Sequence, residues 1–537
     1  MKRRLLSLLL ALCSVFCLVS CKEKNDESTI TIRNLYFNQW TGGDAYTDFL
    51  EKKFEISISP TAYSYNDWDQ QVYGPVQANN LSDVFHFNLD SYNFSNSYVH
   101  WVKGKVIKAL PDNFDKWPNI KATLNKVSNI DQFYIDGKLY CLPIIKDLKN
   151  IEAEYSPFTY VYRRDWAKEL NVYKENDIYT WDEFIALLDA FNKAKNVPNG
   201  QYSHMEAALA DVEWGYPSIT NFYKSVPHCF AVDAAGNVVS NYTTPEYLEA
   251  LELAKQWSQT GSKQYYGLPQ YEYVGKQAGE VTKKYTGKRI GVLYENLSYD
   301  NYSKIRKTMQ ESLSTKDTPC TKQELDDATA IMKVLGPDGK YHLEGTENWY
   351  SATFFNEDIS DAKMEKILDL LDYLLSEEGT MLALYGFEDY DYTLDSDGNV
   401  ELTEAGWEKD MDGKYIDKLN GAKYLRYMIT LGNDTLGKDP LTDKDSLNIL
   451  NAWKAEMDQA IKDNKLVVLK ERGDVKWLAT PHKAEDSGAL LEGANATVFL
   501  YCNPNPDKGI TKDQYLARFN TKQWQDVLKE INDALKK

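Results

Sequence analysis

Hydrophobic side chains recur at helical spacing in several stretches of the chain. In residues 360–375 and 524–535, apolar residues fall three or four positions apart, which places them along one face of an α-helix. Helix-start signals at Thr180 and Thr244 precede two further stretches of the same kind. We therefore expect four amphipathic helices whose apolar faces pack on a core and are not candidate sites.

Short segments of a different kind lie between the helices. Residues 30–37, 84–87 and 289–294 are rich in β-branched and aromatic side chains, as strands are. Turn signals such as the Asp-Gly pairs at 136–137 and 397–398 separate other elements. Strands that alternate with helices predict an α/β fold. The sequence contains no internal repeat and no low-complexity tract.

The N-terminal residues are typical of a secretion signal. Three basic residues at positions 2–4 precede an apolar stretch that runs to Val19, and a stretch of about 15 residues is short for a membrane-spanning helix. The sequence Leu-Val-Ser-Cys that ends at Cys21 resembles the lipobox of bacterial lipoproteins. This resemblance implies a signal peptide over residues 1–20, a lipid anchor at Cys21, a tether over residues 21–28 and a location on the outer face of the cell membrane. The alternative is an ordinary secretory signal with a chance cysteine.

The composition is informative mainly because it excludes some partners and classes of protein. The 537 residues include 80 acidic and 61 basic side chains, which give a formal net charge of −19. This excess of acid repels phosphate backbones, so we expect no nucleic-acid partner. The length corresponds to about three or four ordinary domains, or to fewer if two lobes are large. A hydrophobic content of 43% is typical of a folded chain.

No pattern of catalytic residues stands out. The GxSxG, HExxH, P-loop and GxGxxG motifs are absent, and the six histidines are scattered singly. We therefore expect neither enzymatic activity nor a cofactor, although an acid-rich chain always offers carboxylate pairs of the kind that glycosidases use. Four cysteines remain after the signal and the lipobox, and their spacing leaves both disulfides and buried free thiols open: Cys141, Cys229, Cys320 and Cys502.

One segment partly matches a calcium-binding loop. Asp395, Asp397, Gly398 and Glu404 occupy four positions of the EF-hand pattern, but Thr393 stands where that loop needs a carboxylate. A tight hairpin turn at the Asp-Ser-Asp-Gly sequence explains the same residues. We therefore predict the turn and no metal site.

Five segments together resemble one protein family. In order and spacing they are similar to segments of the extracellular solute-binding proteins of carbohydrate-uptake ABC transporters (solute-binding protein family 1), including its large lipoprotein members. The segments are Asp136 to Pro143, Tyr162 to Trp166, Tyr179 to Phe184, Gly287 to Tyr294 and Leu384 to Tyr392. The second of them is expected to be mostly structural.

The chain departs from the family pattern at three points. Ser82 replaces the proline of a usual Pro-Asp pair, Tyr179 replaces another proline, and Gly-His is absent from residues 387–392. These departures leave the implied fold in place and loosen any transfer of ligand identity.

The resemblance implies a two-lobed periplasmic-binding-protein-like fold of type II. In such a fold, α/β lobes are built from discontinuous segments, joined by hinge strands, and close over the ligand as a monomer. The implied boundaries are an N-lobe of residues 29–147 and 351–386, a C-lobe of residues 148–350 and 387–537, and chain crossings near residues 146–155 and 345–351.

A sugar site needs flat aromatic faces for the C–H side of the ring and a few polar groups for the hydroxyls. Trp40 follows the first predicted strand, at the end where ligands bind in α/β sheets, so it is either a stacking platform or a core tryptophan. The resemblance adds residues that lie near the ligand in relatives. These are Asn88, Asp90, Tyr155, Trp214, Tyr294, Glu295, Asn296 and Glu388, the last with a structural ion pair as its alternative role.

The function that the resemblance implies is transport. The protein would capture a sugar or oligosaccharide in a cleft between the lobes and deliver it, unaltered, to the permease subunits of an ABC importer. Three alternatives stay open: a lipid-anchored glycan-binding protein of another uptake system, a surface glycosidase or lyase, and a binder of the same fold whose ligand is a peptide or an amino-sugar conjugate.

Overall fold

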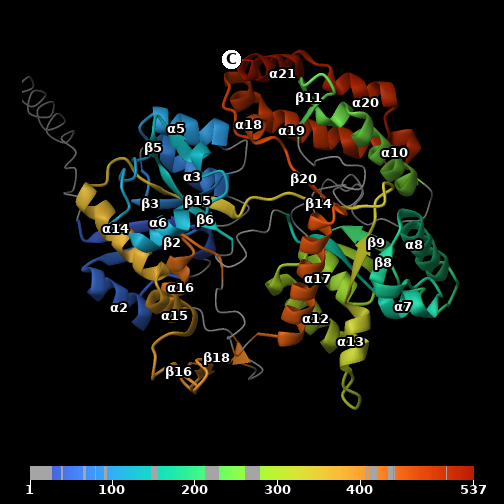
Figure 1. Cartoon of the computed structure of the whole chain (residues 1–537), viewed down its shortest axis with the longest axis horizontal. Helices are drawn as coiled ribbons and strands as arrows, with labels where there is room; N and C mark the ends of the chain where they lie inside the picture. The colour runs from blue at the N-terminus through green and yellow to red at the C-terminus, as the bar shows by residue number, and fades with distance from the viewer. Residues whose placement is uncertain are drawn as a thin grey trace, which may run out of the picture. The chain divides into compact units, whose positions relative to one another are not determined.

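The computed structural model in Figure 1 describes residues 27–536 except for positions 38–39, 64–67, 79, 90–93, 147–154, 212–228, 260–277, 407, 410–414, 417–419, 433–439, 441 and 504. The described chain divides into two units. Unit 1 takes its residues from 1–88, 101–148 and 349–433, and unit 2 from 89–100, 149–348 and 434–537. The boundaries after residues 148 and 348 fall inside the two predicted crossing segments.

Unit 1 is built on a five-stranded sheet of order β2-β1-β3-β15-β6. The strands are β1 (Thr29–Asn34), β2 (Ser57–Ala62), β3 (Val84–Asn88), β6 (Cys141–Ile145) and β15 (Trp349–Phe355). β1 runs parallel to β2 and β3, whereas β15 runs antiparallel to both β3 and β6. The carboxyl ends of β1, β2, β3 and β6 therefore lie at one edge of the sheet.

Helices from distant parts of the chain complete unit 1. In Figure 1 the orange segments of α14, α15 and α16 lie among the blue N-terminal elements. The helices are α2 (Ala45–Phe54), α3 (Trp68–Ala78), α5 (Val99–Lys103), α6 (Pro118–Leu124), α14 (Asp361–Leu375), α15 (Glu377–Tyr385) and α16 (Gly421–Arg426). Unit 1 also contains three pairs of short antiparallel strands. They are β4 (Tyr134–Ile135) with β5 (Lys138–Leu139), β16 (Tyr392–Leu394) with β17 (Val400–Leu402), and β18 (Glu408–Lys409) with β19 (Tyr415–Ile416).

The helix predicted for residues 360–375 is confirmed as α14. The Ser360 side chain caps it by accepting a hydrogen bond from the backbone N–H of Lys363 at 3.0 Å. The Lys363 ammonium is itself buried, and it lies 3.2 Å from the Asp83 carboxylate of the turn before β3. Asp83 also accepts hydrogen bonds from the backbone N–H and the hydroxyl of Thr31 in β1. One buried ion pair thus fastens α14 to two neighbouring strands.

Unit 2 contains a second five-stranded sheet, of order β8-β13-β7-β12-β9. The strands are β7 (Phe158–Tyr162), β8 (Ile178–Tyr179), β9 (Ala207–Asp211), β12 (Ile290–Asn296) and β13 (Ala330–Val334). β7 runs antiparallel to β12 and β13, while β9 is parallel to β12 and β8 is parallel to β13. Two small ribbons accompany this sheet: β10 (Phe230–Val232) with β11 (Val238–Ser240), and β14 (Tyr341–Glu344) with β20 (Leu466–Leu469).

The helices of unit 2 include all three of the other predicted amphipathic helices. The capping box of Thr180 with Glu183 begins α8, and the apolar stripe of residues 524–535 forms α21, where Trp524, Val527 and Ile531 are buried. The helices are α7 (Arg164–Glu169), α8 (Trp181–Lys195), α10 (Pro245–Gln259), α11 (Ala278–Thr286), α12 (Tyr299–Leu313), α13 (Lys322–Ala328), α17 (Lys444–Lys462), α18 (Gly473–Lys476), α19 (Pro481–Tyr501), α20 (Lys512–Phe519) and α21 (Lys522–Leu535).

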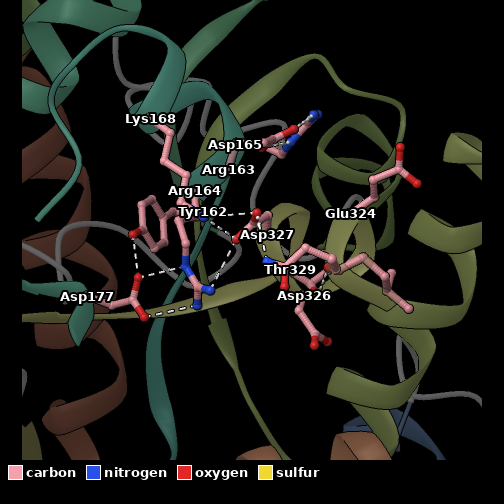
Figure 2. Close-up of polar contacts among 12 residues, drawn as sticks. Tyr162, Arg163, Arg164, Asp165, Lys168, Asp177, Glu324, Asp326, Asp327 and Thr329 are labelled. Atoms are coloured by element: carbon pink, nitrogen blue, oxygen red, sulfur yellow. Dashed lines mark hydrogen bonds and ion pairs between the residues drawn. The ribbon is translucent and has the colours of Figure 1, made fainter. Parts of the chain in front are cut away.

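The segment Tyr162 to Trp166 is part of a polar network, shown in Figure 2. The Arg164 guanidinium donates two hydrogen bonds to Asp177 at 2.9 and 3.0 Å, and a third to Asp327 of α13 at 3.2 Å. The Tyr162 hydroxyl donates to Asp177 at 2.6 Å. These bonds tie the end of β7 and the start of α7 to the turn before β8 and to α13. The segment therefore holds the fold of unit 2 together.

The structure corrects the predicted lobe boundaries in two segments. The described residues of 89–100, expected in the N-lobe, belong to unit 2. Residues 387–433, expected in the C-lobe, belong to unit 1. α16 packs against α15, α14 and α2, and the Thr353 hydroxyl of β15 donates to the carbonyl of Met428 at 2.6 Å. These contacts place the segment in unit 1. The sequence did not reveal them because the partner elements are distant in the chain.

Candidate ligand-binding site

Polar side chains of unit 1 follow one face of its sheet to the carboxyl edge. Asn34 is the last residue of β1 and Asn88 the last of β3. Ile32 pairs with Val84 across these parallel strands. Alternate residues of a strand point to the same face, so Asn34, His86 and Asn88 share that face. Ligands of α/β sheets bind at this edge.

Both asparagine amides keep hydrogen-bonding capacity at the strand ends. Asn34 is 1% exposed, and its carbonyl oxygen accepts a hydrogen bond from the backbone N–H of Tyr36 at 2.8 Å. Its amide nitrogen has no partner among the described residues. The half-buried Asn88 side chain likewise forms no hydrogen bond within the described part of the chain. The Asn34 amide nitrogen is thus a buried donor without a partner among the described residues, and Asn88 is a half-buried amide; each lies on a strand that fixes its position.

Aromatic rings gather at the segment that follows Asn34 in the chain. The half-buried Trp40 is stacked on Tyr424 of α16, with ring centroids 5.3 Å apart and planes 13° apart. Phe37 meets the same indole edge-on at 4.9 Å. The indole N–H donates to the Asp44 carboxylate at 3.0 Å. Tyr424 covers one face of Trp40, so only the opposite face can receive a ligand.

Tyr36 provides a second half-buried ring of this cluster. Its ring lies 5.7 Å from Tyr427, which follows α16, and 5.3 Å from the imidazole of His86. Tyr427 is also half-buried. Flat rings and adjacent amides are the combination that a pyranose ring requires, because the rings receive its C–H face and the amides its hydroxyls. We call this set of Asn34, Tyr36, Trp40, Asn88, Tyr424 and Tyr427 the edge cluster.

A carboxylate that contacts the edge cluster, Asp44, has a structural role. Asp44 caps α2 by accepting from the backbone N–H groups of Tyr46 and Thr47 at 3.0 and 2.9 Å, and its second oxygen accepts from Trp40. Gly421, the first residue of α16, leaves no room for a Cβ, which would lie 1.9 Å from the Thr47 hydroxyl and 2.8 Å from Asp44. This close approach brings α16, and with it Tyr424, against the start of α2.

The predicted residues of unit 2 are arranged differently. Tyr294 is 5% exposed and packs against Phe158 and Tyr160. These three rings line a cavity of about 30 Å³, which is enough for one or two water molecules and far too small for a sugar. We therefore place Tyr294 in the core of unit 2 and not among ligand contacts.

Glu295 and Asn296 secure the end of β12. The Glu295 carboxylate accepts from the Thr282 hydroxyl at 3.0 Å and from the backbone N–H of Asn296 at 2.9 Å. The Asn296 side chain accepts from the backbone N–H of Ser298, the N-cap residue of α12, at 2.9 Å. Both side chains are half-buried and hold the strand-to-helix turn in place.

Tyr155 is buried and anchored inside unit 2. It is 3% exposed, and its hydroxyl donates to the Asp458 carboxylate of α17 at 2.8 Å. Its ring meets Trp453 of the same helix edge-on at 6.1 Å. This side chain joins the start of unit 2 to α17 and leaves no free surface for a ligand.

Glu388 is exposed and lies apart from the edge cluster, in the turn before β16. Burial, together with the nearby Glu388 and Asp389 carboxylates, raises the pKa of Tyr392 to about 12. No ion pair of Glu388 is present among the described residues. The predicted site residues Asp90 and Trp214, and the lipidation residue Cys21, lie outside the described part of the chain.

The predicted turn at Asp395 is confirmed. Its carboxylate accepts hydrogen bonds from the backbone N–H groups of Asp397 and Asn399, both at 2.8 Å, and so closes the β16–β17 hairpin. Within the described residues, no group of three or more potential metal-ligating side chains is found. The four cysteines named above are free thiols. None of the described helices is both long and apolar enough to cross a membrane.

Of the edge cluster, the sequence predicted Trp40 and Asn88 as site residues and did not point to the other four. Asn34 and Tyr36 carried a usable signal, because they end the same predicted strand that pointed to Trp40. Tyr424 and Tyr427 carried none, since they lie in a segment assigned to the other lobe and reach the cluster only through the packing of α16.

Comparison with known proteins gives the fold. No protein-family model matches the chain, and no curated protein matches its sequence. Solved structures do match: the S. pneumoniae ABC-transporter substrate binding protein FusA in complex with kestose is 15% identical, with a TM-score of 0.59 over 95% of this chain and 99% of that one. The alginate-binding protein AlgQ2 is 13% identical, with a TM-score of 0.62 over 95% and 98%. An HMO-binding ABC-transporter associated solute binding protein from Bifidobacterium longum infantis is 16% identical, with a TM-score of 0.61 over 95% and 98%.

These similarities cover nearly the whole of each chain. They confirm the predicted α/β, two-lobed periplasmic-binding-protein-like fold. At 13–16% identity, these similarities show the fold that this chain shares with those solute-binding proteins.

Proposed function

We propose that this protein is a solute-binding protein that captures a sugar or oligosaccharide for an ABC importer. The observation that carries the proposal is the edge cluster itself: the half-buried rings of Tyr36, Trp40 and Tyr427 lie in one set of ring contacts, and Asn34 and Asn88, at the ends of two neighbouring strands, have amide groups with hydrogen-bonding capacity left among the described residues. Similar solved structures were determined with kestose or are named for binding alginate or HMO, which supports a carbohydrate as the ligand class.

The residues of the edge cluster are suited to binding a sugar and not to cleaving its glycosidic bonds. An aromatic face contributes by burying the apolar side of a sugar ring, and an amide contributes both a donor and an acceptor to its hydroxyls. Neither group is a nucleophile or a proton donor of the strength that glycosidic cleavage needs. The sugar therefore leaves the site in the form in which it entered.

Delivery to a transporter requires the protein to stay near the membrane. We propose that Cys21 is lipidated after removal of residues 1–20, so that the protein remains on the outer face of the cell membrane. The partners are then the permease subunits of the importer, which take the sugar from the loaded protein. A lipoprotein that retains glycans for a different uptake system would carry the same anchor.

A thermal-shift screen tests the proposal. The protein without residues 1–21 is heated with a panel of monosaccharides and oligosaccharides, and stabilisation that grows with ligand concentration indicates binding to the native state. We expect one class of oligosaccharide to raise Tm and to be recovered intact. Cleaved products would identify an enzyme instead, and a panel with no effect would overturn carbohydrate binding.

A further inference from the structure

A buried polar network lies directly under the Tyr36 ring of the edge cluster. It consists of Tyr63, which follows β2, His86 in β3 and Ser351 in β15. All three are buried, with exposures of 7%, 1% and 0%. The network spans three strands on the sheet face that also carries Asn34 and Asn88. Ser351 lies directly opposite Asn88 in the β3–β15 pairing.

The hydrogen bonds of the network fix one form of the imidazole. The Tyr63 hydroxyl donates its single proton to the backbone carbonyl of His86 at 2.5 Å. The contact of 2.8 Å between the same hydroxyl oxygen and Nδ1 must then be donated by the imidazole. In a neutral ring Nε2 is left as an acceptor, so the bond of 2.8 Å to Ser351 is donated by the serine hydroxyl. These bonds assign the Nδ1–H tautomer.

The network leaves the imidazole one orientation. Both ring nitrogens are occupied, and a buried polar group that loses its partner pays the cost of desolvation. Burial lowers the pKa of His86 to about 3, so the ring stays neutral at physiological pH. The Tyr36 ring rests edge-on against this fixed imidazole, with an angle of 61° between the ring planes.

We propose that His86 is a positioning residue, held in one orientation by Tyr63 and Ser351, that sets the ring of Tyr36 for contact with the saccharide. This inference rests on the proposed function, because Tyr36 is assigned a ligand contact there. His86 itself is sealed from solvent and does not touch the ligand. Its effect passes entirely through Tyr36.

Two substitutions remove hydrogen bonds from the network. Ser351→Ala takes away the donor to Nε2. Tyr63→Phe takes away the acceptor of Nδ1–H and also the donor to the His86 carbonyl. We measure the Kd of the saccharide found in the thermal-shift screen, by calorimetry, and Tm by calorimetric scanning. Ser351→Ala should weaken binding by about three- to tenfold, the range expected for the loss of one buried hydrogen bond, and Tyr63→Phe, which loses two, by at least as much.

A matched control separates positioning from general destabilisation. Tyr285 is fully buried in unit 2, and its hydroxyl donates to the backbone carbonyl of Ala328 at 2.7 Å. Tyr285→Phe therefore removes the same kind of hydrogen bond away from the edge cluster, and it should lower Tm without changing Kd. The proposal is overturned if Ser351→Ala and Tyr63→Phe also lower Tm and leave Kd at the wild-type value.

A double-mutant cycle tests whether the effect passes through Tyr36. In the Tyr36→Ala background, Ser351→Ala should no longer change Kd, and an effect as large as in the wild type would contradict the proposal. The ¹⁵N NMR signals of His86 provide a readout without ligand: we expect the Nδ1–H tautomer and no titration between pH 8 and 5, and an Nε2–H tautomer would overturn it. If no saccharide binds the wild-type protein, the proposed function fails and this inference fails with it, whatever the tautomer.

Discussion

The indole of Trp40 lies parallel to the ring of Tyr424, 5.3 Å away, although the two residues come from segments that are far apart in the chain. Trp40 follows β1 and its 3-10 turn, whereas Tyr424 is in α16. The stack makes the orientation of Trp40 depend on a helix that sequence analysis assigned to the other lobe. The two residues should therefore act as one unit in binding.

The first prediction concerns this pair. Trp40→Ala removes the stacking face, and Tyr424→Ala removes its support, so both should raise the Kd for the saccharide by tenfold or more, which corresponds to a loss of about 1.4 kcal/mol or more. Isothermal titration calorimetry measures the effect. Tyr390→Ala is a suitable control because Tyr390 is 66% exposed and lies outside the edge cluster. Wild-type affinity in both Trp40→Ala and Tyr424→Ala would show that the site lies elsewhere.

The second prediction concerns the buried ion pair of Asp83 and Lys363. Asp83→Ala leaves the Lys363 ammonium without its partner and also removes two hydrogen bonds from Thr31, so the free energy of unfolding should fall by about 3–5 kcal/mol. Lys363→Met should cost less, because Asp83 keeps its bonds to Thr31. Urea unfolding measures both. The exposed pair of Lys116 and Glu365 provides the control, since Lys116→Met should change stability by no more than about 1 kcal/mol. Equal losses in the buried and exposed variants would contradict the role given to Asp83.

The third prediction concerns pH and His86. Burial lowers the pKa of His86 in the folded protein from 6.5 to about 3, whereas in the unfolded chain the imidazole titrates near its ordinary value. Between these two pH values the unfolded state binds more protons, so acidification through this window destabilises the fold. Above pH 6.5 the contribution is constant.

His86→Gln removes this titration and isolates it from the many carboxylates. The difference in unfolding free energy between wild type and His86→Gln should be constant from pH 7 to 8. At pH 4.5 this difference should be smaller by about 2–3 kcal/mol, because only in the wild type does protonation of the imidazole stabilise the unfolded state. Urea unfolding at both pH values checks this. A difference that does not vary with pH would mean that His86 titrates normally in the folded protein.

The fourth prediction separates Tyr155 from ligand binding. Tyr155→Phe removes the hydrogen bond to the Asp458 carboxylate, so the free energy of unfolding should fall by about 1.5–3 kcal/mol. The ring and its packing against Trp453 remain. The Kd for the saccharide should stay at the wild-type value, because the side chain is anchored to α17. A higher Kd with an unchanged free energy of unfolding would show that Tyr155 contacts the ligand.

Local sequence signals predicted the regular elements well. The apolar stripe of α14, the capping box of α8 and the turn at Asp395 each depend on residues a few positions apart, so the pattern alone specifies them. The two chain crossings were implied by the family resemblance, and the unit boundaries after residues 148 and 348 fall inside them. The position of Trp40 followed from a strand end, which is again a local feature.

The missed features depend on long-range packing. Tyr424 and Tyr427 join the edge cluster because Gly421 lets α16 approach Asp44 and Thr47, and no spacing in the sequence records that contact. Tyr155 and Tyr294 were predicted as ligand contacts from the resemblance, because these positions lie near the ligand in relatives, but their surroundings in unit 2 bury them. His86 gave no signal either, since a single histidine in an apolar strand does not show which partners will bond its two nitrogens.

The central antiparallel strand β15 also determines the order in which the two sheets can be completed. In the described sheet of unit 1, β6 pairs only with β15, and β15 is synthesised after all of residues 149–348. The sheet of unit 2 uses only strands between Phe158 and Val334. During synthesis, the sheet of unit 2 can therefore form while the N-terminal strands of unit 1 still lack their last partner, and closing that long chain loop is a slow step. The sheet that is completed last is the one whose carboxyl edge carries the edge cluster, so ligand-binding competence should appear only after β15 and α16 have been synthesised.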